Sequence, residues 1–278
     1  MRAFVVTVPD ADRELAVDHL FSRGVAAVEE RDSDRNGFVE LWTEVGDEPA
    51  SIADAASSLA AGWAWQSVEI DEAVAASWRE FATPTWVADD VVIVPSWCTV
   101  PATGPALVIS IDPGAAFGLG DHPTTQLTLR AMLDEIGRRE HHSLRVLDVG
   151  CGSGVLAIAA ALRGASTVIG IDIATAAIEA TIANAASNDV EHLVAASTTP
   201  LAELNGSFDI VVANVLAPAL VDMAADLSGV LADGGVLVIS GVLADRHLHV
   251  LDALAPLEPT STLTMDGWAA VSLVSAVE

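Results

Sequence analysis

Three glycines alternate with single residues at 150–154, directly after an apolar run at 146–149. Glycine lets a backbone turn tightly and lets a ligand approach it closely. Asp148 lies two residues before the first glycine, and Asp172 ends the next apolar run, at 168–171. A strand, a glycine turn, a helix and a second strand that ends in a carboxylate together predict a half-sheet that binds a nucleoside.

The two carboxylates indicate which nucleoside is bound. Asp148 puts a negative charge where the pyrophosphate of a dinucleotide would contact the turn, so a cationic ligand is favoured. S-adenosylmethionine carries an α-ammonium group and a sulfonium, and Asp172 can accept hydrogen bonds from ribose hydroxyls. We therefore predict an S-adenosylmethionine site that includes Asp148, Gly150, Gly152 and Asp172.

Two alternatives to this interpretation remain at the level of the glycine turn. NAD is the alternative ligand, although the dinucleotide fingerprint is G-x-G-x-x-G and Val155 stands where its third glycine would fall. The other alternative is a structural turn of the kind that any α/β domain has after its first strand.

A second segment rich in glycine and proline, at 112–125, precedes the first strand of the half-sheet. Such a composition predicts a loop with unusual backbone angles. Thr125 comes where a helix should begin, and hydroxyls and free N–H groups there can hold a carboxylate, here that of the methionine moiety. Helix capping alone is the alternative role. His122 is the histidine nearest to this chemistry in the sequence, and we consider it as a proton relay.

Asn214 ends the apolar run at 208–213 and precedes Leu216 by two residues. The amide oxygen of an asparagine can accept N–H bonds from an incoming amine and aim its lone pair at a methyl group. A lysine amine, with an unperturbed pKa of about 10.4, must first lose a proton. An apolar pocket beside Leu216 would lower that pKa. We therefore assign catalytic roles to Asn214, Leu216 and His122.

The elements before residue 71 form a unit of their own. Their order is β-α-β-β-α-β, which predicts a small ferredoxin-like α+β domain. The unit has no glycine-rich phosphate loop and no plausible catalytic pair, so we interpret it as a recognition module, with shielding of the larger domain as the alternative. The predicted strands are 4–8, 25–30, 37–44 and 63–70, and the predicted helices are 10–23 and 51–61.

The chain after residue 107 alternates between strands and helices. This pattern predicts an α/β, doubly wound, mostly parallel sheet that binds its ligand at the carboxyl ends of its strands. A closing hairpin would make the last strand antiparallel, as in the Rossmann-like sheet of class I methyltransferases. The segment 72–106 is predicted to be a linker helix, over 72–81, followed by short extended pieces. The predicted strands are 144–149, 168–172, 192–196, 208–213, 236–240, 261–265 and 268–274, and the helices after the glycine turn are 155–162, 176–187, about 218–231 and 244–253.

Composition excludes several classes of function. The 278 residues include 12 arginines and no lysine against 39 acidic residues, for a net charge of −27. Such a surface repels nucleic acid and anionic membranes and attracts basic partners, although an acidic, lysine-free composition also suits a GC-rich genome and a salt-adapted cell. No membrane span, signal peptide or metal site is predicted. The two cysteines, Cys98 and Cys151, form no disulfide framework, so we expect a cytoplasmic protein.

Four motifs together resemble the PrmA family, the methyltransferases of large-subunit ribosomal protein L11. They lie at 112–125, 147–154, 169–172 and 212–217, and the resemblance extends over the whole chain. It implies that Thr125, Gly150, Asp172 and Asn214 contact S-adenosylmethionine. It also implies a substrate-recognition domain at 1–71, a joining segment at 72–106 and a methyltransferase domain at 107–278.

The implied reaction is N-methylation of lysine side chains and of the terminal α-amine of L11, either free or on the large ribosomal subunit, by a monomeric enzyme. The chain departs from the family pattern at Leu119, at Val215 and at 174–175, none of which is among the four carried-over positions. Two alternatives stay open: a methyltransferase for lysines of another protein or for a small amine, and a non-catalytic nucleotide-binding or interaction protein.

Overall fold

The computed structural model describes residues 2–23, 25, 28–43, 45, 49–69, 82–102, 104–114, 119–139 and 143–275. The chain divides into two compact units, Met1–Ala82 and Thr83–Glu278. The helix predicted over 72–81 lies outside the described residues, and the boundaries predicted within the joining segment stay a prediction.

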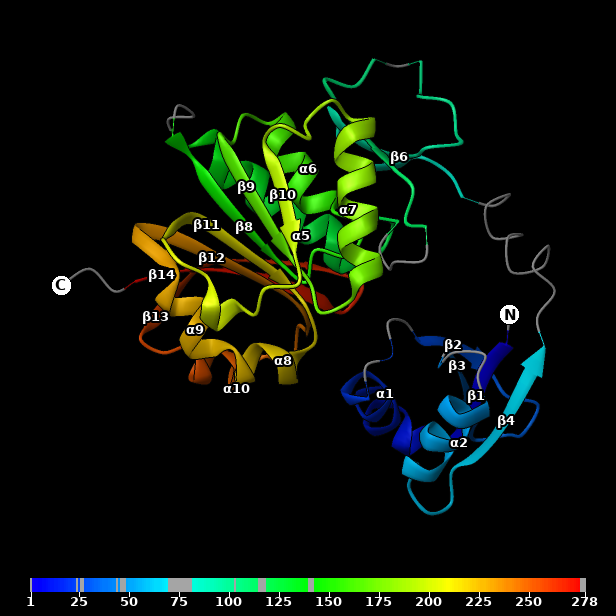
Figure 1. The fold of residues 1–278 in the computed structure, drawn as a ribbon. Coiled ribbons are helices and arrows are strands. Elements are labelled where there is room, and N and C mark those ends of the chain that lie inside the picture. Colours follow the sequence, from blue (N-terminus) through cyan, green and yellow to red (C-terminus); the bar gives the residue numbers. More distant parts are fainter. Residues whose placement is uncertain are drawn as a thin grey trace. The chain divides into compact units, whose positions relative to one another are not determined.

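The first unit has a four-stranded sheet in the order β2-β3-β1-β4, with every neighbouring pair antiparallel (Figure 1). Alternate residues of β1, among them Phe4, Val6 and Val8, are buried against Leu20 of α1 and Ile52 of α2. This period of two is what places one face of a strand in a core. The elements are β1 Arg2–Pro9, a 3-10 turn at Asp10–Asp12, α1 Arg13–Ser22, β2 Val28–Asp32, β3 Phe38–Thr43, α2 Pro49–Ser58 and β4 Ala64–Glu69, in the order predicted from the sequence.

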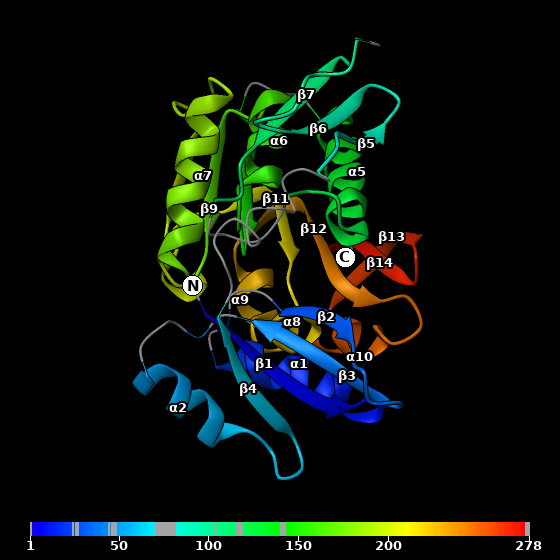
Figure 2. The same cartoon turned by 90° about the vertical axis from the view of Figure 1, so that its right-hand side faces the viewer.

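The second unit begins with a small sheet, β5 Thr85–Ala88, β6 Val91–Pro95 and β7 Leu107–Ile111. β5 and β6 are antiparallel, whereas β6 and β7 are parallel. The sheet lies beside α5 and α6 (Figure 2). Ile93 and Ile109 are buried in the same core as residues of both helices. Sequence patterns predicted only isolated extended pieces before residue 107, because the strands are short and separated by prolines.

The main sheet has seven strands in the order β10-β9-β8-β11-β12-β14-β13. β14 is antiparallel to both of its neighbours, so the predicted antiparallel last strand is confirmed. Its insertion between β12 and β13 is a feature that the sequence pattern did not specify. The strands are β8 Arg145–Val149, β9 Thr167–Ile171, β10 Val194–Ser197, β11 Phe208–Asn214, β12 Leu231–Leu243, β13 Leu257–Met265 and β14 Trp268–Ser275.

Two cores cover the two faces of this sheet (Figure 1). One contains α5 Pro123–Gly137, α6 Val155–Leu162 and α7 Thr175–Ser187; the other contains α8 Ala217–Asp222, α9 Ala224–Gly229 and α10 Leu248–Ala253, with a 3-10 turn at Leu201–Glu203. The prediction of a single helix over about 218–231 is wrong. Met223 leaves helical geometry, with φ −92° and ψ 3°, and divides it into α8 and α9.

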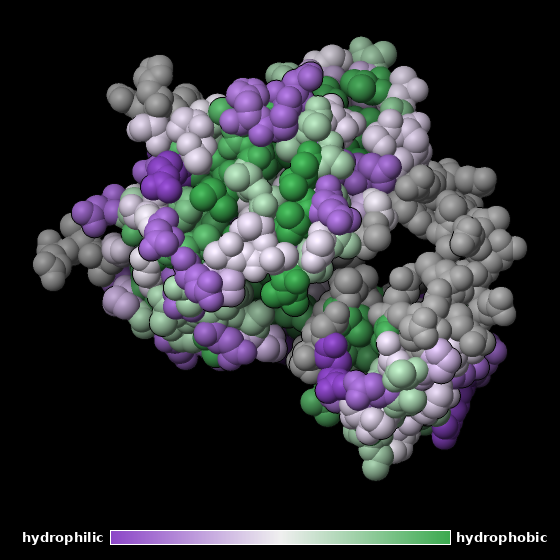
Figure 3. Space-filling model, viewed as in Figure 1, coloured by the Kyte–Doolittle hydropathy of each residue, from purple (hydrophilic) through white to green (hydrophobic). Residues whose placement is uncertain are grey.

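The order of connection reverses between β8 and β11, since β9 and β10 lie on one side of β8 and the later strands lie on the other. A doubly wound sheet opens a ligand crevice at such a switch point, at the carboxyl ends of its strands. Hydrophilic and apolar residues are interspersed over the visible surface of this unit (Figure 3). Of the helices that the structure describes, none has the length and apolar character needed to cross a bilayer.

Candidate active site

The glycine turn between β8 and α6 requires glycine for two separate reasons. Gly150, Gly152 and Gly154 have φ values of +76°, +53° and +82°, in the left-handed region that side chains disfavour. A Cβ atom on Gly150 would lie 2.5 Å from Val215, and one on Gly154 would lie 2.9 Å from Thr181. The turn is therefore both strained for other residues and closely packed on two sides.

Asp172 follows β9 and bonds to the glycine turn. Its Oδ2 accepts a hydrogen bond from the Gly152 N–H at 3.0 Å, and its Oδ1 accepts one from the Ala174 N–H at 2.9 Å. The N–H groups of Gly150 and Cys151 also donate to the Ile171 carbonyl. A carboxylate oxygen has two lone-pair directions, so Asp172 can still accept bonds from ligand hydroxyls.

Asp148 is completely buried beneath the turn. Its Oδ2 accepts a hydrogen bond from the Ala157 N–H at 3.1 Å, whereas its Oδ1 has no partner among the described residues. Burial raises the pKa of Asp148 to about 7, with a further increase from the charge of Asp172 and a decrease from the Ala157 bond. The negative charge of an ionised Asp148 is therefore not compensated by the described residues. A cationic group of a ligand would compensate this charge.

Thr125 and Asn214 are brought together across 89 positions of sequence. The Asn214 Nδ2 donates a hydrogen bond to the Thr125 Oγ1 at 3.3 Å. Thr125 is in the first turn of α5, and Asn214 ends β11, next to the glycine turn that follows β8. Because Asn214 uses its amide nitrogen for this bond, its amide oxygen can accept a bond from another group.

His122 is the N-cap of α5. Its Nδ1 accepts from the Thr124 N–H at 3.3 Å and lies 2.8 Å from the Thr124 hydroxyl, so we assign the proton to Nε2. The ring makes an edge contact with Trp268 at 5.2 Å. Burial lowers the pKa of His122, and the neighbouring Asp121 partly opposes this effect. The lowered pKa favours the neutral form of His122, and its acceptor nitrogen is engaged in helix capping.

The segment after Asn214 packs closely against a glycine, Gly241, that sequence reasoning missed. Leu216 is the half-buried N-cap residue of α8. Gly241, in β12, has a φ of +83°, and a Cβ atom there would lie 2.2 Å from the Val215 carbonyl oxygen. The irregular register of β12 between Ile239 and Val242 is the structural sign of this close approach.

Three polar residues on or just after α7 were also missed: the buried Thr181 and Asn184, and the half-buried C-cap residue Asn188. The Thr181 Oγ1 donates to the Gly152 carbonyl at 3.1 Å, and the Asn184 Nδ2 donates to the Ser153 carbonyl at 2.9 Å. These two bonds attach the glycine turn to α7. Their spacing of three and four in an alanine-rich helix was a signal that could have identified them.

The other predicted features are placed as follows. Residues 115–118 of the predicted loop lie outside the described residues. No group of three His, Cys, Asp or Glu side chains suited to a metal ion occurs in the part of the chain that the structure describes. The structure thus gathers the glycine turn, Asp148, Asp172, Thr125 and Asn214 at one end of β8, β9 and β11.

A seven-stranded sheet with only β14 antiparallel, inserted next to the edge, and with a glycine turn after its first strand defines the class I methyltransferase fold. Comparison with known proteins is more specific. The chain belongs to the family described as ribosomal protein L11 methyltransferase (PrmA), whose model matches residues 7–276.

Two curated relatives and one solved structure illustrate this membership. The protein of Geobacter sulfurreducens named ribosomal protein L11 methyltransferase is 47% identical over 182 residues, which are 66% of this chain and 58% of that protein. The protein of the same name from Halalkalibacterium halodurans is 37% identical over 210 residues, 74% of this chain and 66% of that protein. The match therefore spans less than two thirds of the length of either relative.

The solved structure is that of a ribosomal protein L11 methylase from Lactobacillus delbrueckii subsp. bulgaricus. It superposes with a TM-score of 0.63 at 33% sequence identity, covering 70% of this chain and 99% of that chain. The similarity supports the assignment of the fold as well as of the family.

Proposed function

We propose that this protein transfers methyl groups from S-adenosylmethionine to amines of ribosomal protein L11, namely lysine side chains and the terminal α-amine. Family membership supports the acceptor. The observation that carries the chemistry is the bond between Asn214 and Thr125, which holds an amide with an available oxygen beside the glycine turn.

The residues present fit the methyl donor. The buried Asp148 oxygen, which has no partner among the described residues, suits a cationic group, and Asp172 retains lone pairs for the ribose hydroxyls. The glycine turn allows close approach of the methionine moiety, and Thr125 at the start of α5 suits its carboxylate. When bound, S-adenosylmethionine supplies a methyl group attached to a positively charged sulfur.

The chain's own contribution to methyl transfer is positioning. The Asn214 oxygen would accept an N–H bond from the acceptor amine, and the Thr125 bond keeps the amide from rotating away. Leu216, half-buried at the start of α8, would contribute an apolar wall that favours the neutral amine. His122 would maintain the start of α5 through its capping bonds rather than accept a proton at Nδ1.

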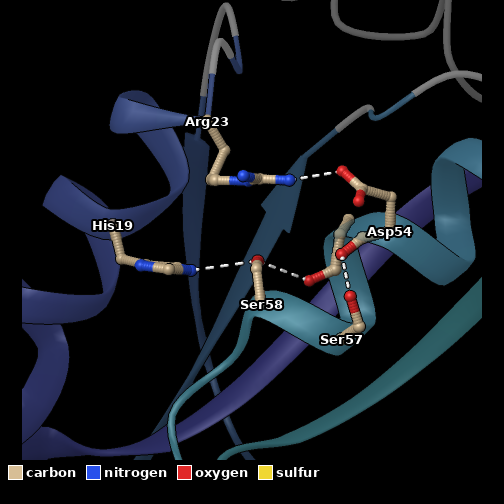
Figure 4. Close-up of polar contacts among 6 residues, drawn as sticks. His19, Arg23, Asp54, Ser57 and Ser58 are labelled. Carbon is tan, nitrogen blue, oxygen red and sulfur yellow. Dashed lines mark hydrogen bonds and ion pairs between the residues drawn. The ribbon is translucent and has the colours of Figure 1, made fainter.

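The first unit is proposed to bind the acceptor protein. It has a pocket of about 520 Å³ between α1 and α2, with Leu20 and Val25 in its lining. Arg23 pairs with Asp54 in this lining, and His19 hydrogen-bonds to Ser58 at 3.1 Å (Figure 4). We further propose that the chain acts as a cytoplasmic monomer on L11, free or in the large ribosomal subunit, without direct contact to nucleic acid or membrane.

Labelled S-adenosylmethionine tests this function. Ribosomes and free L11 from the matching cell, lacking prior methylation, should acquire label in L11 when incubated with the protein. An Asn214→Ala variant should transfer little label, whereas Asn205→Ala, in an exposed loop, should match the parent chain.

The possible outcomes separate the alternatives. Label in another protein or in a small amine alone would contradict the acceptor and leave the chemistry in place. A protein that binds S-adenosylmethionine or its demethylated product but never transfers label would be the non-catalytic alternative.

A further inference from the structure

Two asparagine side chains at the end of α7 face β7. Asn184 lies within the helix and is 3% exposed, and Asn188 is the C-cap residue four positions later. Burial of a side-chain amide costs free energy unless its donors and acceptors are bonded. Alanine, which flanks Asn184 on both sides in the sequence, would avoid that cost and favour the helix. The amides therefore need a compensating role.

Each amide bonds to β7 or its end as a neighbouring strand would. The Asn188 Oδ1 accepts from the Ser110 N–H at 2.9 Å, and its Nδ2 donates to the Ser110 carbonyl at 2.7 Å. Asn184 makes the same pair of bonds with Asp112, at 2.9 and 2.8 Å.

The spacing of the two asparagines along α7 matches the spacing of Ser110 and Asp112 along the chain of β7 and its end. Four residues of helix rise about 6.0 Å, and two residues of strand rise about 6.6 Å. Two asparagines four residues apart on a helix can therefore pair with two residues that are two positions apart on a strand. The result is a side-chain ladder on the edge of β7 that does not pair with β6.

Asn184 makes one bond more than this ladder requires. The same Nδ2 that donates to the Asp112 carbonyl also donates to the Ser153 carbonyl, at 2.9 Å. One amide thus joins α7, the first residue of the 112–125 segment and the glycine turn. Asn188 instead donates its second bond to the Asn184 carbonyl of its own helix, at 2.7 Å. The two asparagines have similar surroundings but different connections.

We propose that Asn184 is a positioning residue for the methyl donor, whereas Asn188 only anchors β7. This inference rests on the proposed function. Asn184 holds the Asp112 end of the 112–125 segment to the glycine turn, and the bond between Asn214 and Thr125 holds its other end to β11. Asp112 and Thr125, the two ends of this segment, are thereby each bonded to an element beside the glycine turn.

Three variants separate positioning from general stability. Asn184→Ala removes the bonds to Asp112 and Ser153, Asn188→Ala removes those to Ser110, and Ser187→Ala is the control on an exposed position of the same helix. Calorimetry with S-adenosylhomocysteine gives the donor-site Kd, thermal unfolding gives Tm, and hydrogen exchange reports the backbone N–H groups of Ser110 and Asp112.

Both asparagine variants should lower Tm by about 5 °C, since each removes the side-chain partners of two backbone groups, those of Asp112 or those of Ser110. Only Asn184→Ala should weaken the Kd, by about tenfold or more. In turnover assays its KM for the donor should rise similarly, with kcat at saturating donor and KM for the acceptor within about threefold of the parent values. Exchange should quicken at Asp112 in Asn184→Ala and at Ser110 in Asn188→Ala, and Ser187→Ala should change nothing.

The inference is overturned if Asn184→Ala binds S-adenosylhomocysteine as the parent chain does, or if Asn188→Ala weakens binding equally. If Asn184→Ala does not fold, Asn184→Ser, whose shorter side chain cannot bridge the Asp112 and Ser153 carbonyls, should show the same selective loss of affinity. A parent chain that binds no S-adenosylhomocysteine would overturn the proposed function. A parent chain that binds it, together with an Asn184→Ala variant of equal affinity, would overturn the positioning role alone.

Discussion

Asp148 is a carboxyl group whose environment in the protein is incomplete. Its Oδ2 is bonded to α6, and its Oδ1 is buried without a partner among the described residues. A structural role alone would be served as well by asparagine, whose side chain is uncharged and of equal size. The retention of a carboxylate there is consistent with a cationic group of the ligand as its missing partner.

The stability of the protein should reflect this incomplete environment. The folded pKa of Asp148 is about 7 against an ordinary value of 3.8, so between these values the folded state keeps a proton that the unfolded state has lost. Stability should therefore fall as pH rises through this range, by about 4 kcal/mol in total. The Asp148→Asn variant lacks this titration and should gain stability relative to the parent chain as pH rises.

Urea unfolding of both chains from about pH 4 to about pH 8 measures this difference. A difference in unfolding free energy that does not change with pH would mean that Asp148 is already ionised in the folded protein. In that case another group of the protein must compensate the charge of Asp148.

Asn214 and His122 should have separable roles. Asn214→Ala removes the amide oxygen that is proposed to bond the acceptor amine and should lower kcat by about 100-fold, a larger effect than that on the donor Kd. His122→Ala removes a helix cap and should cost about 1 kcal/mol of stability, with kcat nearly retained. Steady-state kinetics and calorimetry on both variants check this. Loss of turnover in His122→Ala but not in Asn214→Ala would show that proton relay, not positioning, limits the reaction.

At the scale of elements, the glycine turn is held by α7 and by the segment after β11. Thr181 contacts Gly154, and Val215 contacts Gly150, so two elements that follow the turn by many residues limit its shape. A rigid turn of this kind presents its backbone to a ligand without an ordering cost at the moment of binding.

Alanine at Gly154 should disturb this turn strongly. It would place a side chain at a φ of +82° and at 2.9 Å from Thr181, which should destabilise the protein by about 2–4 kcal/mol and weaken donor binding. Gly137→Ala is the matched control, because it lies at the end of α5 with nothing within 4 Å and should slightly stabilise the helix. Thermal unfolding of both variants is the measurement. Equal changes in the two would contradict the packing argument.

The elements themselves were predictable wherever their pattern was local. Alternating apolar residues identified β1 and β3, and the glycine turn located β8 and α6. The sheet formed by β5, β6 and β7 was not predicted, because it is buried against helices that follow later in the chain. The break at Met223 was not predicted either.

At the scale of the molecule, the net charge of −27 should act on the encounter with the acceptor. A basic acceptor protein is attracted by such a field, and salt screens the attraction. The KM for L11 should therefore rise by about tenfold between about 0.05 and about 0.5 M NaCl, while the KM for the donor changes little. Initial rates at several salt concentrations check this. A KM for the acceptor that does not depend on salt would indicate a small or neutral acceptor.

The sequence by itself determined the kind of ligand, the order of strands and helices in each of the two units, and the residues at the strand ends. These follow from the order and spacing of neighbours, which local backbone geometry translates directly into turns, strands and helices. Asp148, Asp172, Thr125 and Asn214 could be named on that basis.

Only the tertiary structure decided how these residues meet. Packing between distant segments decides the position of β14 between two earlier strands, the bond between Thr125 and Asn214, and the burial of Asp148. The attachment of Asn184 to both Asp112 and Ser153 depends on it as well. No spacing rule specifies such contacts, because their partners become neighbours only when the sheet has assembled.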